Sequence, residues 1–139
     1  MKVLFDTNII LDLLLDRKPF SEHASFLISR VERSEIDGFL CATTITTIHC
    51  LLTKYLDKRK SIESIHSIMA LFEIAPVNRL VIENALESKF SDFEDSVLHE
   101  SARHAGAEYI ITRNIKDFKK SGIPVFTPTE FLNMLESLG

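Results

Sequence analysis

The first dozen residues constrain the fold most, because a short apolar run there stops at a carboxylate and a helix pattern follows at once. Residues 3–5 (Val-Leu-Phe) are apolar without alternation, which is typical of a strand buried on both faces of a parallel sheet. Asp6 ends the run, and Thr7 and Asn8 are good helix caps. Four apolar residues then recur at helical spacing, namely Ile9, Ile10, Leu13 and Leu14. Asp6 is therefore predicted at the carboxyl end of an inner strand, where ligand sites of open α/β sheets gather.

The rest of the chain repeats this alternation of short apolar runs and amphipathic helices. Further strands are expected at 39–42, 73–77, 109–112 and 123–126. Helices are expected at 7–16, from 21, at 43–56, from 61, after 78, at 94–105 and at 131–138. Strands that alternate with helices predict a single α/β domain spanning residues 1–139. Its expected architecture is a three-layer α/β/α arrangement around a central parallel sheet of about five strands.

The composition fits one globular domain and excludes a general basic field. The chain has 139 residues, of which 45% are hydrophobic and 26% charged, which is enough for a sizeable core. Its formal net charge is −4, so any nucleic-acid binding must use local basic patches. No apolar run approaches the roughly 20 residues that cross a bilayer, and residues 1–5 are too short for a secretory signal. We therefore expect no membrane association and a cytoplasmic location.

Acidic side chains occur at places that this fold would bring together. Asp6 ends the first strand, Asp92 and Asp95 flank the start of the 94–105 helix, and Asp117 follows the strand at 109–112. If the first and fourth strands are neighbours, these residues meet at one edge of the sheet. Crowded carboxylates repel one another, and such a cluster normally requires a cation or a raised pKa. Oxygen ligands suit Mg²⁺ or Mn²⁺, which can hold substrate phosphates and activate a water.

Each of these residues also has a purely structural interpretation. Asp6 can cap the helix that follows it, Asp92 and Asp95 can form a reciprocal cap, and Asp117 can cap a short helical turn. His99 lies one helical turn beyond Asp95 and could pair with it, although a structural role is the simpler interpretation. The joint convergence of the acidic residues favours the metal site over capping alone.

Three motifs of the chain resemble those of PIN domains. They are Val-Leu-Phe-Asp-Thr-Asn-Ile-Ile-Leu-Asp at 3–12, Asp-Phe-Glu-Asp-Ser-Val at 92–97 and Tyr-Ile-Ile-Thr-Arg-Asn-Ile-Lys-Asp-Phe at 109–118. The resemblance covers essentially the whole chain. It implies a PIN fold and a metal-dependent ribonuclease with a quartet of acidic residues. Many bacterial members, VapC-like toxins among them, belong to toxin–antitoxin pairs and dimerise. The resemblance thus implies an RNA substrate, an antitoxin partner and a homodimer.

The resemblance assigns roles residue by residue. Asp6 matches the first metal-site aspartate of the family, and Asp95 matches the third acidic position. The last loop matches with Asn114, where many members have Asp, and with Asp117 three residues later. The second acidic position, usually a Glu, falls on Thr47, whose neutral hydroxyl holds a divalent ion less well than a carboxylate.

Because of this departure at Thr47, one weakly bound Mg²⁺ or Mn²⁺ is expected, with Asp92 compensating for the missing carboxylate. The expected metal ligands are Asp6, Asp92, Asp95 and Asp117. The expected catalytic residues are Asp6, Asp95 and Asp117. Substrate contacts are expected from Thr7, Asn8, Thr112, Arg113 and Asn114, although Arg113 could instead pair with a carboxylate.

Three functions are open on the sequence. The first is an endoribonuclease in which a divalent ion orients water for attack on an RNA phosphodiester. The second is a catalytically degenerate module that binds RNA or a protein partner, because Thr47 removes a carboxylate. The third is a metal-dependent phosphatase on a similar sheet. That chemistry normally uses a second Asp two residues after the first, and Asn8 at this position counts against it.

Overall fold

The computed structural model describes residues 1–139 and contains one five-stranded sheet in which all neighbouring strands are parallel. The strands lie in the order β3-β2-β1-β4-β5. Their bounds are β1 Lys2–Phe5, β2 Asp37–Cys41, β3 Glu73–Ala75, β4 Tyr109–Ile111 and β5 Val125–Phe126. The predicted central parallel sheet is therefore confirmed, and the first and fourth strands are neighbours, as the convergence of the acidic residues requires.

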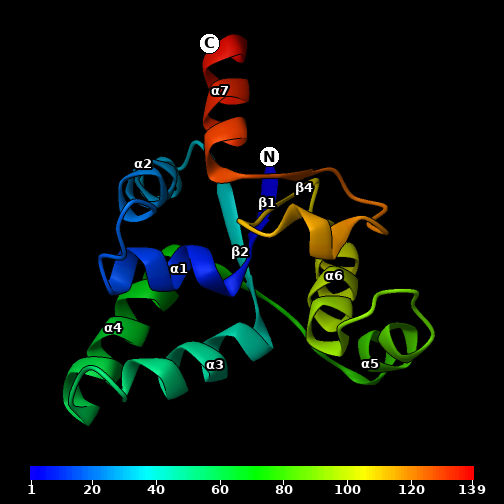
Figure 1. Cartoon of the computed structure of the whole chain (residues 1–139), viewed down its shortest axis with the longest axis horizontal. Coiled ribbons are helices and arrows are strands. Elements are labelled where there is room, and N and C mark those ends of the chain that lie inside the picture. The colour runs from blue at the N-terminus through cyan, green and yellow to red at the C-terminus, as the bar shows by residue number, and fades with distance from the viewer.

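Helices cover both faces of this sheet (Figure 1). They are α1 Thr7–Leu14, α2 Ser21–Glu32, α3 Ala42–Leu52, α4 Lys58–Leu71, α5 Arg79–Leu86, α6 Phe93–Ala105 and α7 Pro128–Leu138, with a 3₁₀ turn η1 at Ile115–Phe118. One buried cluster joins the sheet to α1–α4 and α7, and a second joins it to α5 and α6. The predicted three-layer α/β/α architecture is confirmed.

The central strand β1 explains why its sequence does not alternate. Val3 and Phe5 pack into the cluster beneath α1–α4 and α7, whereas Leu4 packs into the cluster beneath α5 and α6. All three side chains are 0% exposed. A strand covered on both faces needs apolar residues at every position.

Several helix boundaries differ from those predicted: α1 ends at Leu14 and not at 16, α7 begins at Pro128 and not at 131, and both α3 and α4 differ as well. α3 ends at Leu52 and not at 56, because residues 53–56 fold into turns whose amides bond back to the end of the helix. α4 begins at Lys58, three residues before its predicted start. Asp57 makes this earlier start possible, because its carboxylate accepts a hydrogen bond from the Lys60 amide at 2.8 Å. Residues 58–60, which the prediction placed before the helix, are therefore helical.

The pairing of β1 with β4 sets the position of the candidate site. Leu4 lies opposite Ile110 and Phe5 opposite Ile111. The ladder continues one residue further, because the amide of Asp6 donates to the carbonyl of Ile111 at 2.9 Å. This register places Asp6 beside Thr112 at the carboxyl edge of the sheet. None of the helices has the length and apolar character needed to cross a membrane.

Candidate functional site

Asp6 is a buried carboxylate held in place by two hydrogen bonds. It is 8% exposed and lies between β1 and α1. The Thr7 amide donates to its Oδ1 at 2.8 Å, and the Thr112 hydroxyl donates to its Oδ2 at 2.7 Å. Burial raises the pKa of Asp6, and these two hydrogen bonds oppose that rise, while the charge of Asp117 adds to it. Asp6 caps α1, as the structural interpretation predicted, and it is also an oriented carboxylate at the sheet edge.

Asp95 is carried to the same edge by the first turn of α6. The helix starts there because Asp92 caps it, accepting a hydrogen bond from the Asp95 amide at 3.2 Å. Partial burial raises the pKa of Asp95 to about 7, and the charges of Asp92, Asp6, Asp117 and Glu94 add to that rise, in this order. Asp95 therefore interacts electrostatically with all four of these carboxylates, which come from three separate parts of the chain.

A cavity of about 180 Å³ lies between these elements, and we call it the acidic cavity. Its lining residues are Asp6, Thr7, Asn8, Thr43, Thr44, Thr47, Leu51, Glu94, Asp95, Leu98 and Asn114. All nine polar side chains among them carry oxygen atoms, in four hydroxyls, two amides and three carboxylates, and none of the lining side chains is basic. Thr7 and Thr44 join the α1 wall to the α3 wall through their hydroxyls, which are 2.9 Å apart.

Arg113, on the loop after β4, is bound to a carboxylate of α1. Its Nε donates to Asp12 Oδ2 at 2.8 Å and its Nη2 donates to Asp12 Oδ1 at 3.2 Å. Asp12 is only 1% exposed, and Arg17 forms a second ion pair with it at 3.0 Å. The guanidinium of Arg113 also stacks on the ring of Phe20, with its central carbon 3.9 Å from the ring centroid.

The sequence of this chain matches a known protein family. A family model described as "PIN domain" matches residues 2–116. The chain belongs to the PIN-domain family. The resemblance carried by the three motifs is thereby confirmed.

Relatives of this PIN domain cover nearly its whole length. A protein described as "Ribonuclease VapC1" from Aquifex aeolicus (strain VF5) is 28% identical over 142 aligned residues, which are 99% of this chain and 97% of the relative. A structure described as "Toxin-antitoxin complex from Klebsiella pneumoniae" has a TM-score of 0.67 and 26% identity, covering 91% of this chain and 97% of the other. The "Crystal Structure of FitAcB from Neisseria gonorrhoeae" has a TM-score of 0.69 and 22% identity, covering 91% and 98%.

The structure brings together some of the predicted site residues of this PIN domain and separates others. Asp6, Asp95, Thr7, Asn8 and Asn114 line the acidic cavity. Asp117 lies on a neighbouring depression with Arg113 and Lys116, which also includes Asn114. Asp92 is exposed and caps α6 from outside the cavity. Thr112 is buried and contacts Asp6, so it positions that carboxylate and is not open to substrate.

The donor chemistry of the acidic cavity fits a hard divalent ion. Asp6, Glu94 and Asp95 supply carboxylates, and Asn8 and Asn114 supply amide oxygens. Burial and then repulsion by the neighbouring carboxylates raise the pKa of Asp95, and a bound cation relieves this repulsion. The structure contains no group of three or more His, Cys, Asp or Glu side chains already placed to hold a metal ion. The PIN domain therefore offers the ligand types for the ion without a preformed cage of carboxylates.

The Thr47 side chain lies on the wall of the acidic cavity, at the position where the family usually has a carboxylate. Its hydroxyl donates to the Thr43 carbonyl at 3.1 Å, a bond within α3. His99 does not pair with Asp95: its Nε2 accepts from the Gly122 amide at 3.2 Å and its ring stacks on Phe90. His99 therefore has the structural role that the sequence suggested.

Sequence reasoning missed Asp12 and Glu94 as site residues. Asp12 anchors the loop that carries Arg113, and Glu94 lines the acidic cavity. A signal for Asp12 was present, because it is a lone carboxylate among the apolar residues 9–15 and therefore needs a buried partner. Glu94 gives no such signal, because an acidic residue in the first turn of a helix is ordinary.

Asp95 makes the stability of the metal-free protein depend on pH. Its pKa is about 7 in the folded chain against an ordinary 3.8, so between about pH 4 and pH 7 the folded state binds more protons than the unfolded state. The free energy of unfolding should therefore fall as pH rises through this window. Because Asp95 is partly exposed and water screens its repulsion, we expect an effect of about 1–2 kcal/mol.

Urea unfolding in chelator at pH 5 and pH 8 measures this effect, with Asp95→Asn as the comparison. The variant should lose the part of the pH dependence that belongs to Asp95. His99, whose pKa burial lowers, acts in the opposite direction in both proteins and cancels in the difference. Equal pH dependence in the two proteins would contradict the crowding of carboxylates around Asp95.

Proposed function

We propose that this PIN domain is a divalent-metal-dependent endoribonuclease that hydrolyses RNA phosphodiester bonds. The observation that carries the proposal is the convergence of Asp6 and Asp95 on one oxygen-lined cavity at the carboxyl edge of the sheet. Its likeness over nearly the full length to a protein described as a ribonuclease supports the same activity. The proposed cofactor is Mg²⁺ or Mn²⁺, with Asp6 and Asp95 as ligands and with Asp117, Asp92 and Glu94 contributing negative charge around it.

The residues of the chain have separate roles in this reaction. Asp6 is fixed by Thr7 and Thr112, so its two oxygens keep one orientation while a substrate binds. Asp95 reaches the cavity from α6, so two rigid elements of the fold hold the two carboxylates. Mg²⁺ or Mn²⁺, when bound, supplies the positive charge that neutralises a phosphodiester and makes water more nucleophilic. Asn8 and Asn114 add neutral polar groups beside the substrate phosphate.

We also propose that the chain is the toxin of a toxin–antitoxin pair and binds an antitoxin protein. Support comes from the likeness, over 91% of this chain and 97% of the other, to the structure described as "Toxin-antitoxin complex from Klebsiella pneumoniae". A homodimer and a cytoplasmic location stay predictions from the sequence. Side chains suited to a protein contact lie on α4 and α5, where Ile62, Met69, Leu80 and Leu86 are exposed.

One observation favours a second function, namely a degenerate PIN domain that binds RNA without cutting it. Thr47 replaces a carboxylate, and its hydroxyl is already bonded to the Thr43 carbonyl. The same cavity then has fewer charges with which to hold an ion. In this alternative the chain binds RNA, but it holds no divalent ion and does not hydrolyse the phosphodiester bond.

Cleavage of single-stranded RNA by the purified chain in Mn²⁺ and in excess chelator separates the two functions. The proposed nuclease cuts internal bonds in Mn²⁺ and stops when the chelator removes the ion, with activity restored by added Mn²⁺ or Mg²⁺. Binding of RNA without cleavage at millimolar Mn²⁺ would support the degenerate module. Cleavage that resists the chelator would reject the metal-dependent mechanism.

A further inference from the structure

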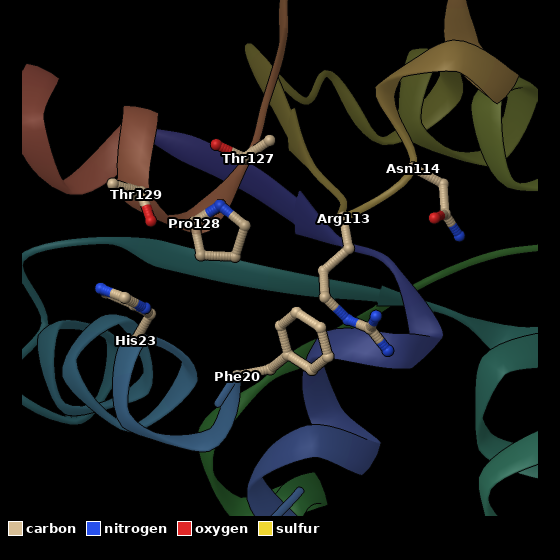
Figure 2. Close-up of a pocket in the computed structure, with 7 residues that line it drawn as sticks. All are labelled: Phe20, His23, Arg113, Asn114, Thr127, Pro128 and Thr129. Carbon is tan, nitrogen blue, oxygen red and sulfur yellow. The ribbon is translucent and has the colours of Figure 1, made fainter. Parts of the chain in front are cut away.

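A second cavity opens on the other side of the loop that follows β4 (Figure 2). Its volume is about 380 Å³, and we call it the arginine cavity. The residues that line it are Phe20, His23, Arg113, Asn114, Thr127, Pro128 and Thr129. They come from the start of α2, the loop after β4 and the start of α7, so three segments far apart in the sequence build it.

The Arg113 guanidinium is held in place in this cavity, but not all of its hydrogen-bond donors are used. Asp12 takes its Nε and Nη2 donors, and the Phe20 ring lies against its guanidinium. The Nη1 amino group makes no hydrogen bond within the protein, so its two N–H donors are free for a ligand. A guanidinium anchored in this way loses little conformational entropy when it binds an acceptor.

The two cavities meet at Asn114, which lines both of them. Their charges are opposite in kind: no acidic side chain lines the arginine cavity, and no basic side chain lines the acidic cavity. An RNA strand with one phosphate at the acidic cavity would therefore have its adjacent nucleoside beside a neutral-to-basic pocket. Phe20 supplies the flat apolar ring of that pocket, and the rings of His23 and Pro128 also line it (Figure 2).

We propose that the arginine cavity binds the nucleoside next to the phosphate that is cut, with the base against the ring of Phe20. This inference rests on the proposed ribonuclease function. Phe20 is 39% exposed, so part of its ring is free although the guanidinium covers another part. Aromatic side chains are the usual platforms for unpaired bases. The volume of the cavity falls within the roughly 300–1,000 Å³ typical of small-ligand sites.

The polar groups of the cavity suit the edges of a base and its ribose. Thr127, Thr129 and Asn114 can each donate and accept hydrogen bonds, and Arg113 Nη1 can donate to a base carbonyl or a phosphate oxygen. These polar groups are few, which is the pattern of a pocket that orients its ligand. The arginine cavity thus supplies a surface on which a base can stack and polar groups that fix the position of the RNA, and the acidic cavity has no aromatic side chain for this.

The test is binding of a fluorescently labelled, single-stranded 2′-O-methyl RNA hexamer, measured by anisotropy in excess chelator. This probe is not cut, so binding is separated from metal and from chemistry. Phe20→Ala should weaken binding by at least about fivefold, the low end for loss of one base stack. Thr129→Phe, which fills the cavity from an exposed position, should weaken binding similarly. Phe26→Ala, at another exposed Phe that lies on α2 and does not line the cavity, should stay within twofold.

A second probe with the same backbone but no bases should bind wild type weakly and respond little to Phe20→Ala. The inference is overturned if wild type does not bind the hexamer, if the abasic probe binds equally well, or if Phe20→Ala and Thr129→Phe bind like Phe26→Ala. It is also overturned if a co-purified protein partner, and not RNA, protects the amides of Thr127 and Thr129. Phe20-dependent binding without any cleavage in Mn²⁺ would support base binding in the arginine cavity while rejecting the nuclease.

Discussion

Asp6→Asn should reduce Mn²⁺-dependent RNA cleavage by at least about 100-fold, because loss of a metal ligand costs more than the 10–100-fold typical of its supporting residues. The substitution keeps the size of the side chain and still allows a hydrogen bond from the Thr7 amide to the remaining carbonyl oxygen. It removes a charge that is oriented toward the acidic cavity from the carboxyl end of β1. Fold and packing should therefore persist while activity is lost.

The matched control is Asp37→Asn, the same substitution at the opposite end of the neighbouring strand β2. Asp37 is exposed and pairs with the amino terminus at 3.7 Å, a contact worth little in water. Its cleavage rate should equal that of wild type. Cleavage by Asp6→Asn at the wild-type rate would remove Asp6 from the mechanism, and equal loss in both variants would indicate a general effect of charge.

Asp12→Ala should lower the free energy of unfolding by about 2–4 kcal/mol, near the range measured when one partner of a buried ion pair is removed. The carboxylate is 1% exposed and serves Arg113 through two hydrogen bonds and Arg17 through an ion pair. Its loss leaves two arginines facing an apolar helix. Because the Arg17 and Arg113 side chains are 38% and 24% exposed, water relieves part of this cost.

Urea unfolding measures this loss, with Glu83→Ala as the control. Glu83 pairs with Arg79 on the exposed face of α5 at 3.0 Å, and removing it should change stability by less than about 0.5 kcal/mol. Asp12→Ala should also weaken binding of the 2′-O-methyl hexamer, because Arg113 loses its anchor. A change in stability no larger than that of Glu83→Ala would contradict the structural role given to Asp12.

The sequence alone predicts the three layers of this fold and the presence of carboxylates at the carboxyl edge of the sheet, because both depend on local sequence patterns. An unbroken apolar run at 3–5 requires a strand covered on two faces, and the structure covers β1 on both. The positions of Asp6 and Asp95 follow from this arrangement, because the carboxyl ends of the parallel strands and the amino end of α6 lie at the same edge of the sheet. The cap of α6 by Asp92 was likewise readable from spacing.

The remaining parts of the site depend on contacts between distant segments. Arg113 was expected either at the substrate or in an ion pair with a carboxylate, and two of its donors bond to Asp12, which is 101 positions away in the chain. Nothing local to Asp12, Phe20 or Thr127 shows that they surround the same loop. Thr47 was correctly placed on the cavity wall, although the bond from its hydroxyl to Thr43 could not be foreseen.

The central claim is that the acidic cavity holds a divalent ion through Asp6 and Asp95. Diffraction from crystals of the chain soaked in Mn²⁺, collected where manganese scatters anomalously, tests it most directly. The account predicts one anomalous peak within about 2.5 Å of an oxygen of Asp6 and an oxygen of Asp95, as expected for oxygen ligands of such an ion. A saturating soak that leaves this cavity without a peak, or that places the ion away from both carboxylates, would contradict the account.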